Sequence, residues 1–185
     1  NLYYDRHDTN QRDESILRLK ARYQQSGRLW YDLSMWGTQA SNGFDAFAID
    51  NSRNTQSDRP GQDATQSRAG SFKITSRLSN ATKLEAITTA ARTRINYSFD
   101  GDWGNNPFWA PYDPYDYFSD SNRVRRMVAE ELRFSSDDPL YEHGEKWRWI
   151  GGAYFQHLTE GTTTTESSNG EAYDYLKSDY AANQG

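Results

Sequence analysis

Cysteine is absent from this chain of 185 residues, and proline is scarce, with five residues. Without cysteine the chain forms neither disulfide bonds nor thiolate metal sites. Only 35% of the residues are hydrophobic, which is low for a soluble globular domain of this length. No stretch approaches 18 consecutive apolar residues, so the sequence predicts no transmembrane helix. The net charge of -5 disfavours a nucleic-acid partner, and we expect none.

Aromatic residues, in contrast, make up 15% of the chain, which is too many for a disordered protein. Low hydropathy combined with many aromatic side chains is typical of a sheet whose two faces differ in polarity. Two architectures have this property. One is a transmembrane β-barrel with a polar lumen, and the other is a hydrated β-sandwich with large loops.

Alternation of apolar and polar residues predicts the strands. In Ser15–Gln24, for example, Leu17 and Leu19 alternate with Arg18 and Lys20, which is the period of a strand with one apolar face. We predict an all-β fold, an antiparallel meander of about six to seven long strands. Six strands are expected near residues 15–24, 28–37, 67–78, 84–99, 123–134 and 146–158, and Ala172–Leu176 is a candidate start for another.

The predicted links alternate in length. Those near residues 26, 80 and 140 are short, whereas the loops at 38–66, 100–122 and 159–185 are long. Outer-membrane barrels have short periplasmic turns and long extracellular loops, and the expected strands reach the 9 to 11 residues, roughly, that cross a bilayer. We therefore expect residues 1–185 to form a single segment of a large transmembrane β-barrel.

Two adjacent carboxylates conflict with a simple lipid-facing row. Because Glu130 and Glu131 are neighbours, one of them must share the face of Val128 and Leu132. A carboxylate that faces lipid near the middle of the bilayer is costly. A β-bulge at this point would change the register and remove the conflict.

Three pieces of the sequence together resemble the barrel of a TonB-dependent outer-membrane receptor, and the likeness covers most of residues 1–160. The pieces are Asn42–Asp63 leading into Ala69–Ile74, Ala86–Trp103, and Glu130–Ser136 followed by Trp147–Phe155. The last piece is similar to the family's glutamate-leucine-arginine strand, periplasmic turn and tryptophan-to-glycine strand.

The resemblance implies a 22-stranded barrel with an N-terminal plug and a TonB box, in the outer membrane of a Gram-negative bacterium. It implies active import of a scarce ligand such as a ferric siderophore, cobalamin or an oligosaccharide, with no cofactor. The chain has no plug, TonB box or signal peptide, and it ends in Ala-Ala-Asn-Gln-Gly. We therefore expect an interior segment that contacts membrane lipid and depends on a plug and TonB through parts absent from this chain. The alternative is a soluble β-sandwich binding module for carbohydrate.

Basic side chains are expected to line the lumen, where they would attract anions. The candidates are Arg18, Arg22, Lys73, Arg92, Arg94 and Arg133, opposed mainly by Asp32 and Glu131. Equally, these residues can pair with a plug or with one another, because barrel interiors are generally polar.

The loop at 100–122 is rich in aromatic and acidic residues. Its candidate ligand contacts are Trp103, Phe108, Trp109, Tyr112, Tyr115 and Tyr117. Aromatic platforms suit sugars and catecholate-like ligands, although a long loop can also be packed by its own side chains. Asp100-Gly101-Asp102 is similar to the start of a calcium loop, but Pro111 occupies the position of the bidentate glutamate.

Catalytic motifs are not found. His7, His143 and His157 are scattered, and there is no zinc-protease motif, no nucleophile elbow and no P-loop. We therefore expect no enzymatic activity.

Overall fold

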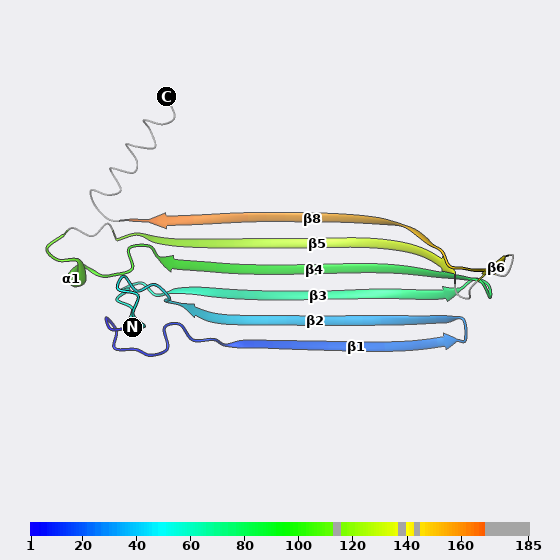
Figure 1. The fold of residues 1–185 in the computed structure, drawn as a ribbon, viewed down its shortest axis with the longest axis horizontal. Helices are drawn as coiled ribbons and strands as arrows, with labels where there is room; N and C mark the ends of the chain where they lie inside the picture. Colours follow the sequence, from blue (N-terminus) through cyan, green and yellow to red (C-terminus); the bar gives the residue numbers. More distant parts are fainter. Residues whose placement is uncertain (113–115, 137–139, 143–144, 169–185) are drawn as a thin grey trace, which may run out of the picture.

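The computed structural model describes residues 1–112, 116–136, 140–142 and 145–168. Six long antiparallel strands form one open sheet with the order β1-β2-β3-β4-β5-β8, so that neighbours in the sheet follow one another along the chain (Figure 1). Their bounds are β1 (Glu14–Ser26), β2 (Leu29–Phe44), β3 (Gly61–Arg77), β4 (Thr82–Asp100), β5 (Phe118–Ser136) and β8 (Ile150–Ser167). The predicted all-β antiparallel meander is confirmed.

Small elements lie at the two ends of the sheet. Strands β6 (Leu140–Glu142) and β7 (Glu145–Trp147) pair with each other at the end that carries the short turns. A single helical turn, α1 (Asn106–Trp109), lies in the loop at the other end, where Asn105 caps it by accepting a hydrogen bond from the amide of Phe108. Among the described residues, no helix is both long and apolar enough to cross a membrane.

The strands extend further toward the long-loop end than the sequence predicts. The β2–β3 ladder continues to the pair Phe44 and Gly61, and the β5–β8 ladder continues to Phe118 and Ser167. These extensions are polar on both faces, so they lack the alternation that reveals a strand, yet each backbone still finds partners in its neighbours. The predicted loops at 38–66 and 100–122 are correspondingly shorter. The candidate strand at Ala172–Leu176 lies outside the described residues.

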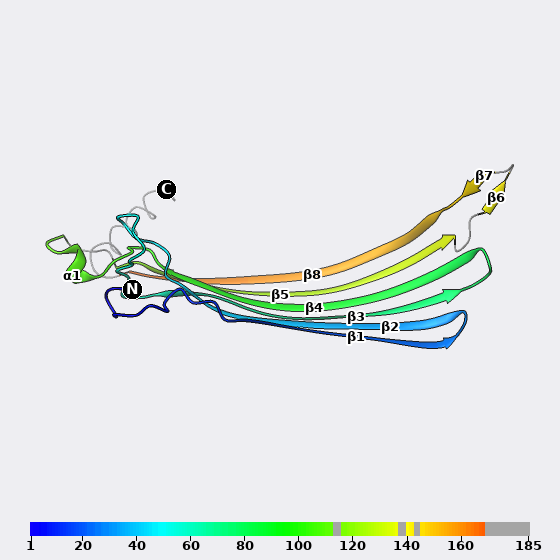
Figure 2. The same ribbon diagram turned by 60° about the horizontal axis from the view of Figure 1, so that its bottom comes forward.

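The sheet is a single curved layer (Figure 2). Ala129 is the only buried hydrophobic residue in the described part of the chain, whereas Leu19 is 57% exposed and Phe155 is 65% exposed. The six strands do not divide into two facing sheets around a dry core. This arrangement differs from the two-sheet packing that a β-sandwich requires.

No β-bulge interrupts the strands at Glu130. The β4–β5 ladder passes through the pair Thr88 and Glu130, and the β5–β8 ladder through Glu130 and Phe155, without a shift in register. Glu130 therefore shares the face of Val128 and Leu132. Instead of a bulge, the carboxylate gains a hydrogen-bond donor, because the hydroxyl of Thr88 donates to it at 2.8 Å.

Candidate functional site

Directly paired residues of an antiparallel ladder project from the same side of the sheet, so the register assigns every strand residue to one of two faces. One face, here called the apolar face, carries a band of apolar side chains near the short-turn end. Members of this apolar band include Leu17, Leu19, Tyr23, Tyr31, Leu33, Met35, Phe72, Ile74, Leu84, Ala90, Val128, Leu132, Phe134 and Phe155.

The apolar band has the extent of a membrane-facing surface. At a rise of about 3.4 Å per residue, it spans about 20 Å along β4 from Leu84 to Ala90 and about 27 Å along β2 from Leu29 to Gly37. Aromatic rings gather at its short-turn margin, where Tyr31 stacks on Tyr23 at 6.2 Å and on Phe72 at 6.1 Å between ring centroids.

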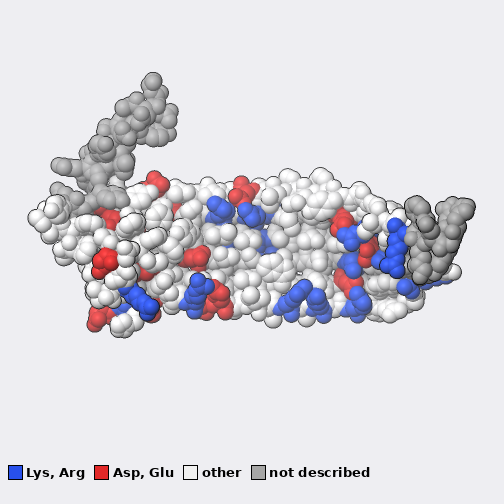
Figure 3. Space-filling model, in the orientation of Figure 1, with Lys and Arg blue, Asp and Glu red and all other residues white. Residues whose placement is uncertain are grey.

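The opposite face carries charges at the same height. Six side chains of alternating sign run across five strands, and we call this set the charge ladder. Its members are Arg22, Asp32, Lys73, Glu85, Arg133 and Glu131. In Figure 3 the blue and red side chains alternate in a column across the strands near the short-turn end.

Each step of the charge ladder is an ion pair. Arg22 binds Asp32 at 2.6 Å, and Lys73 lies 3.5 Å from Asp32 and 3.5 Å from Glu85. Arg133 continues the chain of contacts, at 3.8 Å from Glu85 and in a hydrogen bond with Glu131. Isolated exposed pairs contribute little to stability, but charges that share partners in a network can contribute more.

The register divides the six basic candidates between the two faces. Arg22, Lys73 and Arg133 belong to the charge ladder, and Arg18 lies on the same face one row beyond Lys20. Arg92 and Arg94 lie on the apolar face, apart from the other four.

Strand β4 carries apolar residues on both faces. Ile87 and Ile95 share the face of the charge ladder, and Leu84 and Ala86 share the apolar face. The alternation within β4 alone therefore does not distinguish the faces. The sequence analysis also did not select Glu85 as a charged residue of this face. Glu85 and Ile87 are two residues apart in a strand, which places both on one face.

At the long-loop end, three parts of the chain pack into a unit that we call the loop cluster: residues 1–10, residues 45–60, and residues 101–112 with 116–117. Asn1 donates to the carboxylate of Asp45 at 2.8 Å and to the carbonyl of Ser57 at 2.9 Å. Asn105 donates to the carbonyl of Gln56. The loops are therefore held to one another and to the start of the chain.

Two of the predicted ligand contacts lie at one hollow in the loop cluster. Trp103 stacks on Phe47 with 5.2 Å between ring centroids, and Trp103 and Phe108 are 41% and 42% exposed. Both line a hollow of about 130 Å³, and Leu2 and Ile49 are among the residues that line it from the other two segments. The sequence carried no signal for Leu2, Ile49 or Phe47, because only the fold brings the three segments together.

The other predicted contacts have different surroundings. Trp109 packs against Gly104 and Tyr117 packs against Gly101, since a Cβ at either glycine would overlap the ring. Tyr112 is 76% exposed, and Tyr115 lies outside the described residues. Part of the loop at 100–122 is therefore packed by its own side chains, which was the alternative to ligand binding.

Carboxylates are buried in the loop cluster and at the adjoining end of β4. Asp100 and Asp102 are 7% and 6% exposed, and burial, reinforced by the charge of Asp102, raises the pKa of Asp100 to about 7. Burial also raises the pKa of Asp58, helped by the charges of Asp116 and Asp102. Within the described parts of the chain, no group of three or more His, Asp or Glu side chains is arranged to hold a metal ion.

No protein-family model matches this sequence, and no curated protein matches it.

Proposed function

We propose that this chain is a segment of the barrel of an outer-membrane receptor that imports a scarce ligand with energy supplied through TonB. The observation that carries the proposal is the contrast between the faces at one height: the apolar band on one side and the charge ladder on the other. A sheet that separates lipid from a polar lumen needs this contrast, whereas a soluble sheet would cover its apolar side with a second layer.

The proposed orientation follows from where the apolar band lies. It occupies the short-turn end of the strands, and β2 to β5 continue beyond it as extensions whose side chains on that face are mainly polar. In this proposal the short turns are periplasmic, and the extensions rise out of the membrane to carry the loop cluster outside. The edge strands β1 and β8 would pair with further strands of the barrel, because an unpaired edge is not tolerated in hydrocarbon.

The ligand class and the energy source rest on the sequence resemblance. A ferric siderophore, cobalamin or an oligosaccharide would meet the loop cluster first, where Trp103 and Phe108 offer exposed ring area beside the hollow. Such rings bind sugar and catecholate surfaces with little loss of side-chain entropy. The plug and TonB would act on the face that bears the charge ladder.

Site-directed spin labelling tests which face meets lipid, and the lack of native cysteine makes each label unique. Labels at Leu19, Ile74 and Leu132 on the apolar face should be accessible to oxygen dissolved in the bilayer. Labels at Ser34, Ser71 and Thr89, which lie at similar height on the opposite face, should instead be accessible to a water-soluble nickel chelate. If the first three labels were shielded inside a compact water-soluble particle, the membrane proposal would be wrong.

A further inference from the structure

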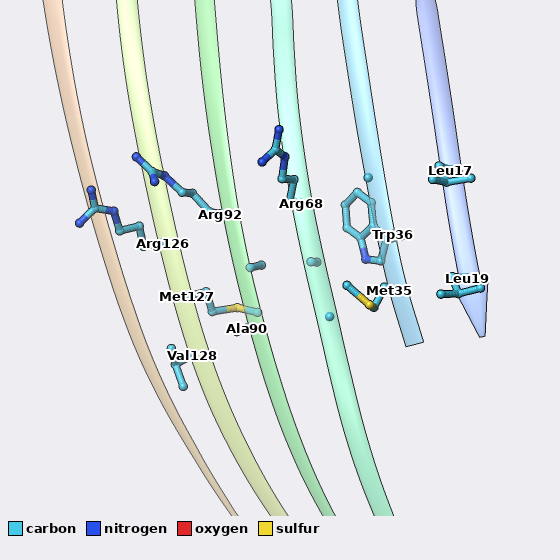
Figure 4. Close-up of a pocket in the computed structure, with 14 residues that line it drawn as sticks. Leu17, Leu19, Met35, Trp36, Arg68, Ala90, Arg92, Arg126, Met127 and Val128 are labelled. Atoms are coloured by element: carbon cyan, nitrogen blue, oxygen red, sulfur yellow. The ribbon is translucent and has the colours of Figure 1, made fainter. Parts of the chain in front are cut away.

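Three arginines stand in one row of the apolar face, at the margin of the apolar band nearest the loop cluster. Arg68 pairs with Arg92 in the β3–β4 ladder, and Arg92 pairs with Arg126 in the β4–β5 ladder. We call these three the arginine row. Arg94 lies on the same face, in the next row toward the loop cluster. Figure 4 shows the three side chains side by side on neighbouring strands.

The arginine row has no counter-charge within the described residues. The carboxylates that form ion pairs among the described residues pair with other cations. None of them contacts Arg68, Arg92 or Arg126. Like charges placed directly opposite each other in a sheet repel. On the other face, by contrast, Arg125 is paired with Glu160 at 2.5 Å. An anion from outside the described chain would therefore relieve the repulsion within the arginine row.

An apolar hollow of about 680 Å³ adjoins the arginine row. The arginine row lines one side of the hollow. The next row on the same face, which includes Leu19, Met35 and Val128, lines the other side. Gly70 lies in that second row, and a Cβ added there would have only ordinary contacts, the closest at 3.5 Å. The hollow thus has space for an aliphatic chain beside three cations.

We propose that the arginine row and this hollow bind one phosphate-bearing lipid, with the phosphate on the guanidinium groups and part of one acyl chain in the hollow. This inference rests on the proposed function, since it requires the apolar face to meet lipid. Arginine binds phosphate through two parallel N–H donors, and basic residues at the margin of a membrane-facing surface select anionic head groups. Charge complementarity selects this occupant over a neutral lipid.

The test uses the protein reconstituted in phosphatidylcholine bilayers. Spin-labelled phosphatidic acid is compared with spin-labelled diacylglycerol that carries the same chains, and the fraction of each probe immobilised by the protein is measured. We expect phosphatidic acid to be preferred. Replacement of Arg68, Arg92 and Arg126 by glutamine should weaken its association about a hundredfold, at about fivefold for each arginine near the membrane surface. The matched control replaces Lys20, Arg123 and Arg125 by glutamine on the opposite face and should keep the preference.

Gly70→Leu tests the acyl part of the site independently. It fills the hollow without removing charge, and we expect about tenfold weaker association of phosphatidic acid, because the chain loses the burial of a few methylene groups. Inorganic phosphate should compete poorly. If it competed as well as phosphatidic acid, the arginine row would bind phosphate alone and the proposal of a lipid site would be overturned.

Three further results would overturn the proposal. These are equal association of the two probes, equal losses in the arginine and control variants, or a change in oligomeric state without a change in lipid preference. The spin labels at Leu19, Ile74 and Leu132 distinguish failure of the lipid-site proposal from failure of the proposed function. Lipid contact at those labels without a preference for phosphatidic acid rejects only the lipid site, and no lipid contact rejects both.

Discussion

Glu130 occupies the middle of the apolar band, between Phe72 and Phe155 in its row, and it has one hydrogen-bond donor, Thr88. A lipid-facing carboxylate at mid-depth is destabilising, though less so than a lysine or an arginine. Glu130→Leu is therefore expected to stabilise the protein in a bilayer by about 1–2 kcal/mol, as measured by guanidinium unfolding in liposomes.

Glu131→Leu is the matched control for this prediction. Glu131 lies on the opposite face and accepts hydrogen bonds from Arg133, so its loss should destabilise the protein by leaving a cation with one partner fewer. The interpretation of Glu130 would be contradicted if both substitutions changed the free energy of unfolding in the same direction.

Asp100 is the residue whose titration should be visible near neutral pH. Its folded-state pKa is raised to about 7 by burial, above the ordinary value of about 3.9 for an unfolded chain. The folded state thus holds a proton that the unfolded state releases, so the stability contribution is present below about pH 4 and is lost as the pH rises to about 7. The largest slope is about 1.4 kcal/mol per pH unit.

Asp100→Asn should remove this slope. Its amide oxygen can still accept the hydrogen bond from the amide of Asp102, which Asp100 accepts at 3.2 Å, and no proton is bound or released. We expect hydrogen exchange in the loop cluster to accelerate from pH 5 to 7, after correction for intrinsic rates, in the natural protein but not in this variant. An unchanged dependence in the variant would assign the effect to another group, such as Asp58.

At the scale of a single element, β3 begins where backbones approach closely. Gly61 pairs with Phe44, and a Cβ at Gly61 would overlap the carbonyl of Ser98 in β4. Gly61→Ala should therefore force the strands apart at the long-loop end and cost about 1–3 kcal/mol, as overpacked sites do.

Gly37→Ala is the control, because a Cβ there lies 3.7 Å from the nearest atom, the carbonyl oxygen of Ser67. It should leave stability nearly unchanged in the same unfolding measurement. Comparable losses in the two alanine variants would show that strand glycines matter for a reason other than close backbone approach.

At the scale of the whole molecule, the six-stranded sheet has two edges and an apolar face that no other described part of the chain covers. Strands β1 and β8 each pair with one long neighbour, and open edges with exposed apolar surface promote association. The isolated chain should therefore associate in water and require detergent. Gel filtration without detergent, with circular dichroism to verify strand content, checks this. A monodisperse, strand-rich monomer would contradict it.

The amino-acid sequence by itself determined the strand class and the meander order, because alternation and turn residues are local signals. Ser15–Gln24 is an example, since Leu17, Leu19 and Tyr23 fall on one face of β1 as the alternation predicts. For the candidate site, the structure places the predicted lumen residues Arg22, Lys73 and Arg133 on one face, and the predicted ligand contacts Trp103 and Phe108 are partly exposed. Their roles as lumen and ligand contacts stay predictions.

Tertiary structure alone decided the rest. The extensions of β2 and β3 exist because hydrogen-bonding partners lie beside them, and their own residues carry no alternation. Arg92 was assigned to its face by the register across strands, which depends on residues far apart in the chain. The hollow at Trp103 joins three distant segments, and a pattern read along one segment cannot contain that contact.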